Sequence, residues 1–300
     1  MSLFNKLVVA TLPAIPKSVV KIVAQRYIAG EKLSDAVRVT QQLMSKGASS
    51  TIDVLGEFVT TKERAVSETA AQSAVIDAIA ENGLHSYLSV KPTSLGLDVD
   101  NDFAFENLTS LVRKAKGKGI FVRMDMENTP YTDITLDFYK RLRHDGFDNV
   151  GVVIQAYLKR SVQDIQSLLD FAPSVRLCKG IYVESADVAF KDAEQIRDNY
   201  KKLLSMLLNS GARAHIATHD ELLISDAERQ VAQHRPDGTD VEFQMLLGVR
   251  EDRRDQLLKA GHAVRIYVPF GDDWYGYSTR RLKENPQVAG YVAKAFLTGT

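Results

Sequence analysis

Short runs of β-branched and apolar residues alternate with longer amphipathic segments from residue 49 onward, and this alternation restricts the possible folds more than any other feature. Runs of about 4–8 apolar residues are typical of buried strands, whereas apolar residues spaced by three or four are typical of helices. The predicted strands are residues 50–58, 85–92, 120–127, 150–157, 175–182, 213–220, 241–248 and 263–271. Eight strand-then-helix units over about 250 residues match a (β/α)8 barrel in number and length.

A chain of 300 residues is also long enough for two domains, and a doubly wound sheet is the alternative arrangement of alternating strands and helices. A doubly wound sheet that binds a dinucleotide normally carries G-x-G-x-x-G after a strand, and this motif is absent from the sequence. We therefore predict one barrel over residues 49–300, preceded by a helical segment over residues 1–48.

The charge balance excludes a global attraction to nucleic acid or to an anionic membrane. Lys and Arg number 38, and so do Asp and Glu, so any anion-binding site must be local. Cys178 is the single cysteine, which excludes an intramolecular disulfide, fits a reducing, cytoplasmic compartment, and is expected to be a buried small residue. The sequence contains no run of about 18 apolar residues, the length needed to span a bilayer. The short apolar run near the start continues as a helical pattern and has no signal-peptide cleavage site.

Polar side chains gather where the predicted strands end, which is where the active site of such a barrel lies. They are Asp53, Glu57, Lys91, Asp125, Glu127, Gln155, Arg176, Lys179, Tyr182, Thr218, His219, Glu242, Gln244 and Tyr267. Each of them could belong to a structural network in which buried polar groups satisfy one another. Charged groups from four different strands would converge at one end of the barrel, however, and burying them there is costly unless they are paired or bind a ligand.

A pair of arginines follows the last predicted strand. The residues Tyr277, Arg280, Arg281 and Glu284 are spaced i, i+3, i+4 and i+7, so a helix would place them on one face. Two neighbouring arginines can hold a carboxylate or phosphate in fork geometry, and the tyrosine one turn away suits a small substrate with an apolar part. The alternative is a surface ladder in which Glu284 pairs with both arginines.

Sequence blocks at all eight predicted strands carry a resemblance to one enzyme family. The blocks are "DVLGE", "LSVKPTSLGLD", "VRMDME", "VVIQAYLKR", "VRLCKGIYVE", "ATHD", "VEFQMLLG" and "RIYVPFGDDWYGYSTRRLKEN". In this order, over residues 50–286, they resemble proline dehydrogenase, the flavin-dependent enzyme of proline catabolism, in its single-function bacterial form. The final Y-x-x-R-R-x-x-E block is the most specific part of the resemblance.

The resemblance implies a distorted (β/α)8 barrel that holds FAD non-covalently at the carboxyl ends of the strands, without a metal ion. The last helix would cover the flavin, and this mode of binding would explain the absent dinucleotide motif. The implied FAD contacts are Gln155, Arg176, Lys179, Tyr182, Thr218, His219 and Glu284, of which Gln155 and Arg176 would contact the isoalloxazine.

The resemblance also implies a set of catalytic and substrate-binding residues. They are Glu57, Lys91, Asp125, Leu177, Tyr267, Tyr277, Arg280 and Arg281. Lys91 and the two arginines would bind the proline carboxylate, and Leu177, Tyr267 and Tyr277 would form the walls around the ring. Asp125 would act beside Lys91, and Glu57 would pair with Arg280 as a gate when no substrate is bound.

The implied reaction is oxidation of L-proline to 1-pyrroline-5-carboxylate, the first step of proline degradation to glutamate. Hydride would pass from the ring carbon next to nitrogen to the flavin, and the electrons would pass to a membrane quinone. The three cations around the carboxylate would lower the pKa of the substrate amine, which must be neutral before hydride leaves. A 1-pyrroline-5-carboxylate dehydrogenase is expected as a further partner, nucleic acid is not, and the enzyme would be cytoplasmic with peripheral contact at the inner membrane.

Two residues depart from the family pattern, and two other functions are open. Asp220 stands in "THD" where the family often has asparagine, which affects the expected FAD contacts of that loop, and Cys178 stands where an aliphatic residue is usual. One alternative function is a Schiff-base lyase or aldolase that uses Lys91 or Lys179 as the nucleophile. The other is a non-catalytic barrel that senses an amino acid with the same carboxylate clamp.

Overall fold

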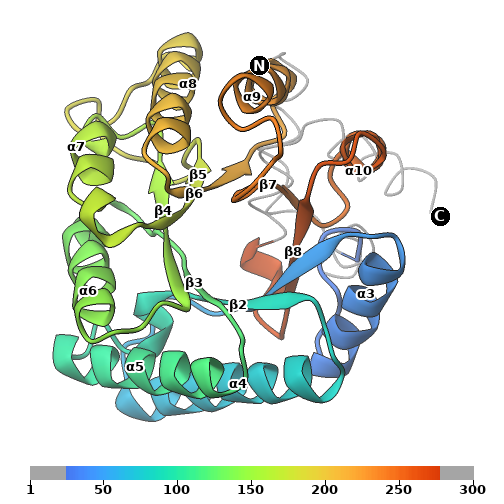
Figure 1. Ribbon diagram of the computed structural model, residues 1–300. Helices are drawn as coiled ribbons and strands as arrows, with labels where there is room; N and C mark the ends of the chain where they lie inside the picture. Colours follow the sequence, from blue (N-terminus) through green and yellow to red (C-terminus); the bar gives the residue numbers. More distant parts are fainter. Residues whose placement is uncertain (1–24, 278–300) are drawn as a thin grey trace, which may run out of the picture.

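The computed structural model describes residues 25–277, in which eight parallel strands close into a barrel (Figure 1). Each strand pairs with the next in the sequence, and β8 pairs with β1 to complete the ring. The strands are β1 (Ser49–Val54), β2 (Ser86–Val90), β3 (Val122–Met124), β4 (Val150–Gln155), β5 (Ser174–Cys178), β6 (Arg213–Ala217), β7 (Val241–Leu246) and β8 (Val264–Phe270). The predicted (β/α)8 barrel is therefore confirmed.

The strands are shorter at their carboxyl ends than the sequence pattern predicted. The third strand, for example, was expected over residues 120–127 and covers Val122–Met124. The second strand cannot continue past Lys91 because Pro92 has no backbone N–H to donate, and the 3-10 helix η2 (Pro92–Leu95) begins there. Several of the predicted site residues thus follow the strands directly instead of lying within them.

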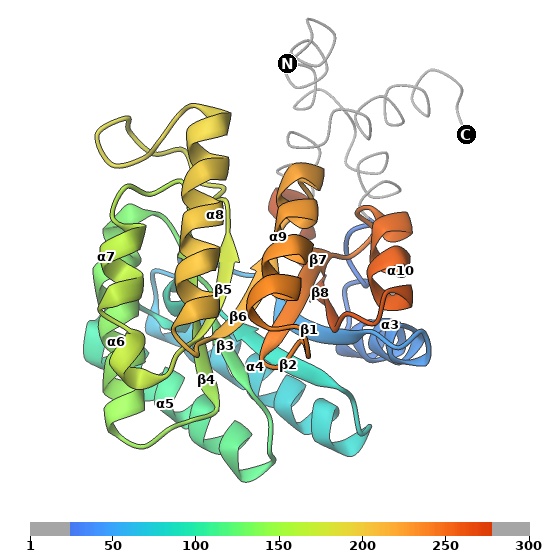
Figure 2. The same cartoon turned by 45° about the horizontal axis from the view of Figure 1, so that its top comes forward.

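The helices form an outer layer around the strands, and Figure 2 shows α6 to α10 standing around the barrel. Their bounds are α3 (Leu33–Ser45), α4 (Lys62–Glu81), α5 (Asn101–Gly117), α6 (Thr132–His144), α7 (Ser161–Gln166), α8 (Ala193–Asn209), α9 (Glu221–His234) and α10 (Glu251–Lys259). Short 3-10 helices are η3 (Thr129–Tyr131) and η4 (Leu169–Phe171). Four helices begin at a side chain that accepts a first-turn N–H, namely Thr61, Asp100, Asp192 and Asp220. Such a cap stabilises a helix by about 1 kcal/mol.

Helix α3 covers the junction of β8 and β1, although it precedes both strands in the sequence (Figure 1). Its buried face includes Ala36 and Leu43, and the Thr40 hydroxyl accepts a hydrogen bond from Ser50 of β1 at 3.3 Å. The chain just before α3 is tied to the end of β8, because Ala29 N–H donates to the Pro269 carbonyl at 2.9 Å. The described part of the N-terminal segment therefore belongs to the barrel wall, and a domain boundary at residue 48 remains a prediction.

The strands place their apolar side chains outward, against the helices, and their polar side chains inside the barrel. In β3, Val122 and Met124 belong to the apolar core between strands and helices, whereas Arg123 between them faces the interior. Such alternation follows from the two-residue period of a strand. The interior differs from that of most such barrels, in which branched apolar side chains predominate.

Arg123 is fully buried inside the barrel, and its side chain reaches Ser174 at the amino end of β5. Its guanidinium donates to the Val152 carbonyl at 2.8 Å, and to the Ser174 carbonyl and hydroxyl at 2.7 and 2.8 Å. It reaches β5 by passing over Gly151 of β4, where an added Cβ would lie 2.5 Å from Arg123 Nη1. The absence of a side chain at position 151 therefore permits the arginine to cross the barrel.

Cys178 ends β5 and is partly buried. Burial raises the pKa of its thiol to about 12, although Arg176 opposes the shift. A thiol with so high a pKa is not a nucleophile at neutral pH, in agreement with the expected packing role.

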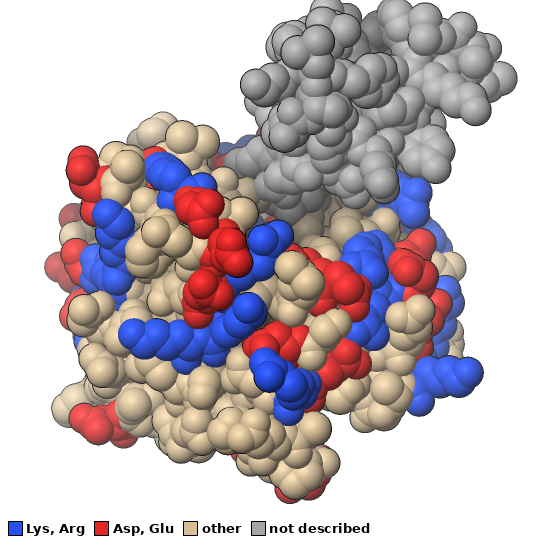
Figure 3. All heavy atoms as spheres, turned by 90° about the horizontal axis from the view of Figure 1, so that it is seen from above, with Lys and Arg blue, Asp and Glu red and all other residues tan. Residues whose placement is uncertain are grey.

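Charged side chains of both signs lie side by side on the face shown in Figure 3. Ion pairs also link neighbouring helices, such as Arg253 of α10 with Glu221 and Glu228 of α9. Among residues 25–277, no helix has the length and apolar character needed to cross a membrane.

Candidate active site

Charged and hydroxyl side chains from five strands meet at the carboxyl end of the barrel. Lys91 Nζ lies 2.8 Å from Asp53 Oδ1 and 3.7 Å from Asp125 Oδ2. Arg176 Nη1 donates to Asp125 Oδ1 at 2.6 Å, and the Tyr267 hydroxyl donates to Asp125 Oδ2 at 2.8 Å. The predicted convergence of Lys91, Asp125, Arg176 and Tyr267 is thus observed in the structure, with Asp53 as an additional member.

Lys91 is a largely buried cation, with 12% of its side chain exposed, and it is shared by two carboxylates. Burial alone would lower the pKa of its ammonium, but Asp53 and Asp125 outweigh this effect and raise the pKa above its ordinary value. Burial raises the pKa of Asp53 to about 6, and Lys91 opposes that shift. The two directions are compatible because one lysine serves two carboxylates, of which Asp53 receives the weaker compensation. Lys91 therefore stays protonated and suits an anionic ligand.

Asp125 is the most fully compensated carboxylate of the cluster. Burial would raise its pKa, but Arg176 and Lys91 outweigh this effect and hold the pKa below its usual value. Ser89 adds a hydrogen bond to Oδ1 at 2.9 Å. Burial and the neighbouring Asp125 keep the pKa of Tyr267 well above its usual value, so the phenol stays protonated and donates.

Glu127 is a second buried carboxylate at this end of the barrel, and its side chain is 0% exposed. It accepts hydrogen bonds from the backbone N–H and the hydroxyl of Thr93, which begins η2 with Pro92. Burial raises its pKa to about 7, against the effect of these two hydrogen bonds. The Gln155 amide donates to the Glu127 carbonyl at 2.8 Å and is thereby fixed at the end of β4.

The guanidinium of Arg176 has one amino group, Nη2, without a partner among the described residues. Its Nε donates to Gln244 Oε1 at 2.6 Å and its Nη1 to Asp125, whereas the buried Nη2 finds no hydrogen-bond partner within residues 25–277. An unpaired buried donor is costly, so a site for an acceptor at Nη2 is indicated.

The loop after β6 carries the expected FAD residues Thr218 and His219. Thr218 is buried, and His219 Nε2 accepts a hydrogen bond from the Leu246 N–H at 2.9 Å. Asp220, which departs from the family pattern, caps α9 and pairs with Lys179 at 3.2 Å. The aspartate thus keeps a structural role in this loop while fixing the exposed lysine beside it.

Leu177 is the one described residue whose position contradicts its predicted role. It is fully buried in the apolar core, and its carbonyl accepts a hydrogen bond from Tyr200 of α8. Because Arg176 faces the interior and side chains alternate along a strand, Leu177 faces the helices. The prediction that its side chain forms a wall of the substrate site is therefore wrong in this structure.

The remaining predicted residues are only partly described. Glu57 follows β1 and is half-buried, Tyr182 follows β5, and Tyr277 is buried at the end of the described chain. The residues Arg280, Arg281 and Glu284 lie outside the described range. The carboxylate clamp and the gate between Glu57 and Arg280 therefore remain predictions.

The sequence interpretation missed several polar residues inside the barrel. Asp53 and Gln244 were noted near strand ends without an assigned role, and Arg123 and His215 were not noted at all. The available signal was strand alternation, since Arg123 lies between two apolar residues in "VRM" and His215 between two in "AHI". A polar residue between two apolar ones in a buried strand has to face the barrel interior.

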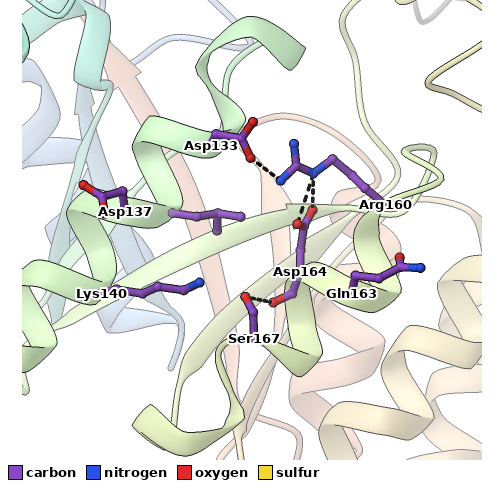
Figure 4. Close-up of a pocket in the computed structure, with 8 residues that line it drawn as sticks. Asp133, Asp137, Lys140, Arg160, Gln163, Asp164 and Ser167 are labelled. Carbon is purple, nitrogen blue, oxygen red and sulfur yellow. Dashed lines mark hydrogen bonds and ion pairs between the residues drawn. The ribbon is translucent and has the colours of Figure 1, made fainter.

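A surface groove of about 320 Å³ between α6 and α7 is separate from this cluster (Figure 4). There Arg160 pairs with Asp133 and binds both carboxylate oxygens of Asp164 at 3.0 Å, and Ser167 donates to the Asp164 carbonyl. The single arginine of the groove is thus already bound to two carboxylates. The cluster at the carboxyl end of the barrel, with its unpaired Arg176 N–H, is the better candidate for the active site.

The two lysines of the Schiff-base alternative do not have the environment of a nucleophile. Such a lysine needs a lowered pKa, usually from an apolar pocket or a second cation. Lys91 instead has a raised pKa because Asp53 and Asp125 surround it. Lys179 is exposed and pairs with Asp220.

A closed parallel barrel with paired charges at the carboxyl ends of its strands is the architecture of a (β/α)8-barrel enzyme. Comparison with known proteins refines this class. The family model described as proline dehydrogenase matches residues 36–294. The chain is 38% identical over 274 residues to proline dehydrogenase 1 of Bacillus subtilis (strain 168), covering 91% of this chain and 90% of that protein. It is 37% identical over 280 residues to proline dehydrogenase of Deinococcus radiodurans, covering 92% of this chain and 90% of that protein.

A solved structure of proline utilization A (PutA) from Bdellovibrio bacteriovorus, inactivated by N-propargylglycine, is similar in fold, with a TM-score of 0.83 at 24% identity. The match covers 88% of this chain and 32% of that one, so the chain spans about a third of the PutA protein. The chain belongs to the proline dehydrogenase family and resembles its single-function bacterial members over nine tenths of their length. It is accordingly an enzyme of proline oxidation, and neither the lyase nor the sensor is favoured.

Proposed function

We propose that this enzyme uses FAD to oxidise L-proline to 1-pyrroline-5-carboxylate. The observation that carries the proposal is the largely buried chain of Lys91, Asp125 and Arg176, which ends in Arg176 Nη2, unpaired within residues 25–277. Lys91 offers a protonated ammonium to a carboxylate, and Arg176 offers a fixed N–H to the isoalloxazine. An anionic substrate and a flavin would thus meet above the same carboxylate.

Several described residues fit contacts with FAD. Gln155 and Arg176 would lie at the isoalloxazine. Both are buried, and they are held by the hydrogen bonds that they donate to the Glu127 carbonyl and to Gln244. Lys179, Thr218 and His219 would contact the rest of the cofactor from the loops after β5 and β6. Tyr182 and Glu284 complete the proposed set. When bound, FAD would supply the hydride acceptor, which no side chain can provide.

The proposed substrate contacts combine described and undescribed residues. Lys91, Arg280 and Arg281 would hold the proline carboxylate, while Tyr267 and Tyr277 would enclose the ring. The three cations would also disfavour a protonated substrate amine and so promote the neutral form from which hydride leaves. The gate between Glu57 and Arg280 would close this site in the absence of substrate.

The clamp is tested by the variant Arg281→Met. We expect weaker binding of proline and of carboxylate analogues that compete with it, because a charge-assisted hydrogen-bond donor is lost. The dissociation constants of an analogue are measured by titration of the flavin absorbance. Unchanged affinity for both proline and the analogue would remove Arg281 from the site.

We also propose the onward path of the products. The electrons would pass to a membrane quinone, which requires a cytoplasmic enzyme to contact the inner membrane peripherally. The product would pass to a 1-pyrroline-5-carboxylate dehydrogenase and on to glutamate. The bifunctional form of PutA proteins among the relatives supports such a link.

The visible absorption spectrum of the purified protein tests the whole proposal. We expect flavin bands that bleach when L-proline is added without oxygen, and that return when an artificial quinone is supplied. Colourless protein, or bands that proline leaves unchanged, would contradict it. Trapping of a substrate adduct by borohydride would support the lyase, and binding of proline without turnover would support the sensor.

A further inference from the structure

A buried polar network lies inside the barrel, on the amino-terminal side of the active-site cluster, and the proposed reaction does not use it. We call it the lower network. Its members are Arg123, His215, Glu242 and Arg265, all at most 9% exposed. Arg265 Nε donates to Glu242 Oε1 at 2.8 Å, and Arg123 Nη2 lies 2.9 Å from His215 Nδ1. Gln244 stands between this network and the active-site cluster, and its amide contacts both.

The contacts of Gln244 allow only one orientation of its amide. A guanidinium has no acceptor, so His215 Nδ1 must accept from Arg123 and the ring proton must lie on Nε2. Burial and the surrounding arginines hold the pKa of His215 well below its usual value, which keeps the ring neutral. Gln244 Nε2 lies 3.1 Å from this same acceptor nitrogen and 2.8 Å from Glu242 Oε1. Since both neighbours accept, the amide nitrogen must face them.

The amide oxygen of Gln244 consequently faces the active site, where it accepts from Arg176 Nε at 2.6 Å. Asp125 holds the Nη1 of the same guanidinium at 2.6 Å. Two hydrogen bonds to different atoms fix the plane of a guanidinium, so the direction of the unpaired Nη2 is fixed as well. Only the Gln244 contact originates in the lower network.

We infer that Gln244 is a positioning residue: it holds the Arg176 guanidinium so that Nη2 is directed at the flavin, and the lower network holds Gln244 in turn. This inference rests on the proposed FAD site. In this arrangement Arg123, His215 and Glu242 act on the cofactor through one amide, without touching it. The polar network inside the barrel thus has a function besides pairing its own buried groups with one another.

The test compares Gln244→Met with Gln244→Glu in the full chain. Methionine is similar in length, but its thioether is only a weak acceptor for Arg176. A glutamate can accept from Arg176, but it cannot donate to Glu242 and His215. We expect Gln244→Met to bind added FAD about tenfold more weakly, as follows from losing a hydrogen bond to a charged group. We also expect it to shift the midpoint potential of bound FAD. Gln244→Glu keeps an acceptor for Arg176 but loses the donor to Glu242 and His215, so it should also weaken FAD binding and shift the potential.

Gln72→Met is the control for loss of a buried amide. Gln72 is buried like Gln244, but its amide contacts Ser94 at 2.9 Å and none of the residues of the proposed FAD site. It should leave FAD affinity and midpoint potential unchanged. If Gln244→Met is not recovered folded, Gln244→Asn replaces it, since the shorter amide cannot keep both sets of contacts. Wild-type affinity and potential in the Gln244 variants, or equal changes in the control, would overturn the inference. Failure of the wild-type protein to bind FAD would instead overturn the proposed function.

Discussion

Glu127 gives a prediction whose size follows from its burial. Its side chain is 0% exposed, its two hydrogen bonds come from the neutral groups of Thr93, and its pKa is raised to about 7 from 4.5. The folded protein therefore retains a proton that the unfolded chain releases. The resulting stabilisation is complete below pH 4.5 and is lost as the pH rises through 7. The pKa difference of about 2.5 corresponds to about 3 kcal/mol.

The substitution Glu127→Gln removes this titration. The amide stays neutral at every pH and can still accept from the Thr93 N–H, so the variant should not lose this stability as the pH rises. For a protein of this size, about 1 kcal/mol of stability corresponds to about 2 °C in melting temperature. The melting temperature of the variant minus that of the wild type should therefore be about 6 °C higher at pH 8 than at pH 5. Thermal unfolding followed by circular dichroism, at equal FAD content, measures this difference.

The control is Glu106→Gln on the exposed face of α5, for which the difference from wild type should not change with pH. A constant difference for Glu127→Gln between pH 5 and pH 8 would refute the reasoning. It would mean that a nearby positive charge stabilises the ionised Glu127 carboxylate enough to offset the cost of its burial.

Three further predictions concern other buried groups. Asp53→Asn removes the negative charge that holds the active-site lysine. In steady-state kinetics, KM for proline should rise about tenfold with a smaller change in kcat, and an unchanged KM would contradict this. Gly151→Ala places a Cβ 2.5 Å from Arg123 Nη1, so the free energy of unfolding should fall by about 1–3 kcal/mol in urea titrations. Gly117→Ala, which meets nothing within 4 Å, should not lower it. Cys178 should react with thiol reagents far more slowly in the folded protein than after unfolding, because its thiol pKa is raised to about 12; equal rates would contradict its burial.

The barrel itself could be predicted from the sequence because each strand carries its own apolar signal and each helix its own period. The carboxyl ends of the strands could be predicted as the site for the same reason, since parallel strands in a barrel end together. Lys91, Asp125, Arg176 and Tyr267 were found in this way, from position and from resemblance.

Contacts that depend on the register between strands could not be predicted. The pairing of Lys91 with Asp53 requires β1 and β2 to align so that Asp53 lies beside Ser89, and no local pattern encodes that alignment. The helix-facing position of Leu177 also depends on which residues of β5 face inward. The crossing of Arg123 over Gly151 depends on three strands at once.

The place of α3 in the wall has a consequence for the connectivity of the barrel. Between β8 and β1, where a regular barrel places the helix that follows its last strand, the described chain has a helix that precedes its first. Within residues 25–277, this seam of the wall is therefore covered by a helix from before the first strand. A chain shortened to start at Ser49 would lose the apolar cover that Ala36 and Leu43 of α3 give to this seam. We therefore expect α3 and the eight strands to unfold together as one cooperative unit.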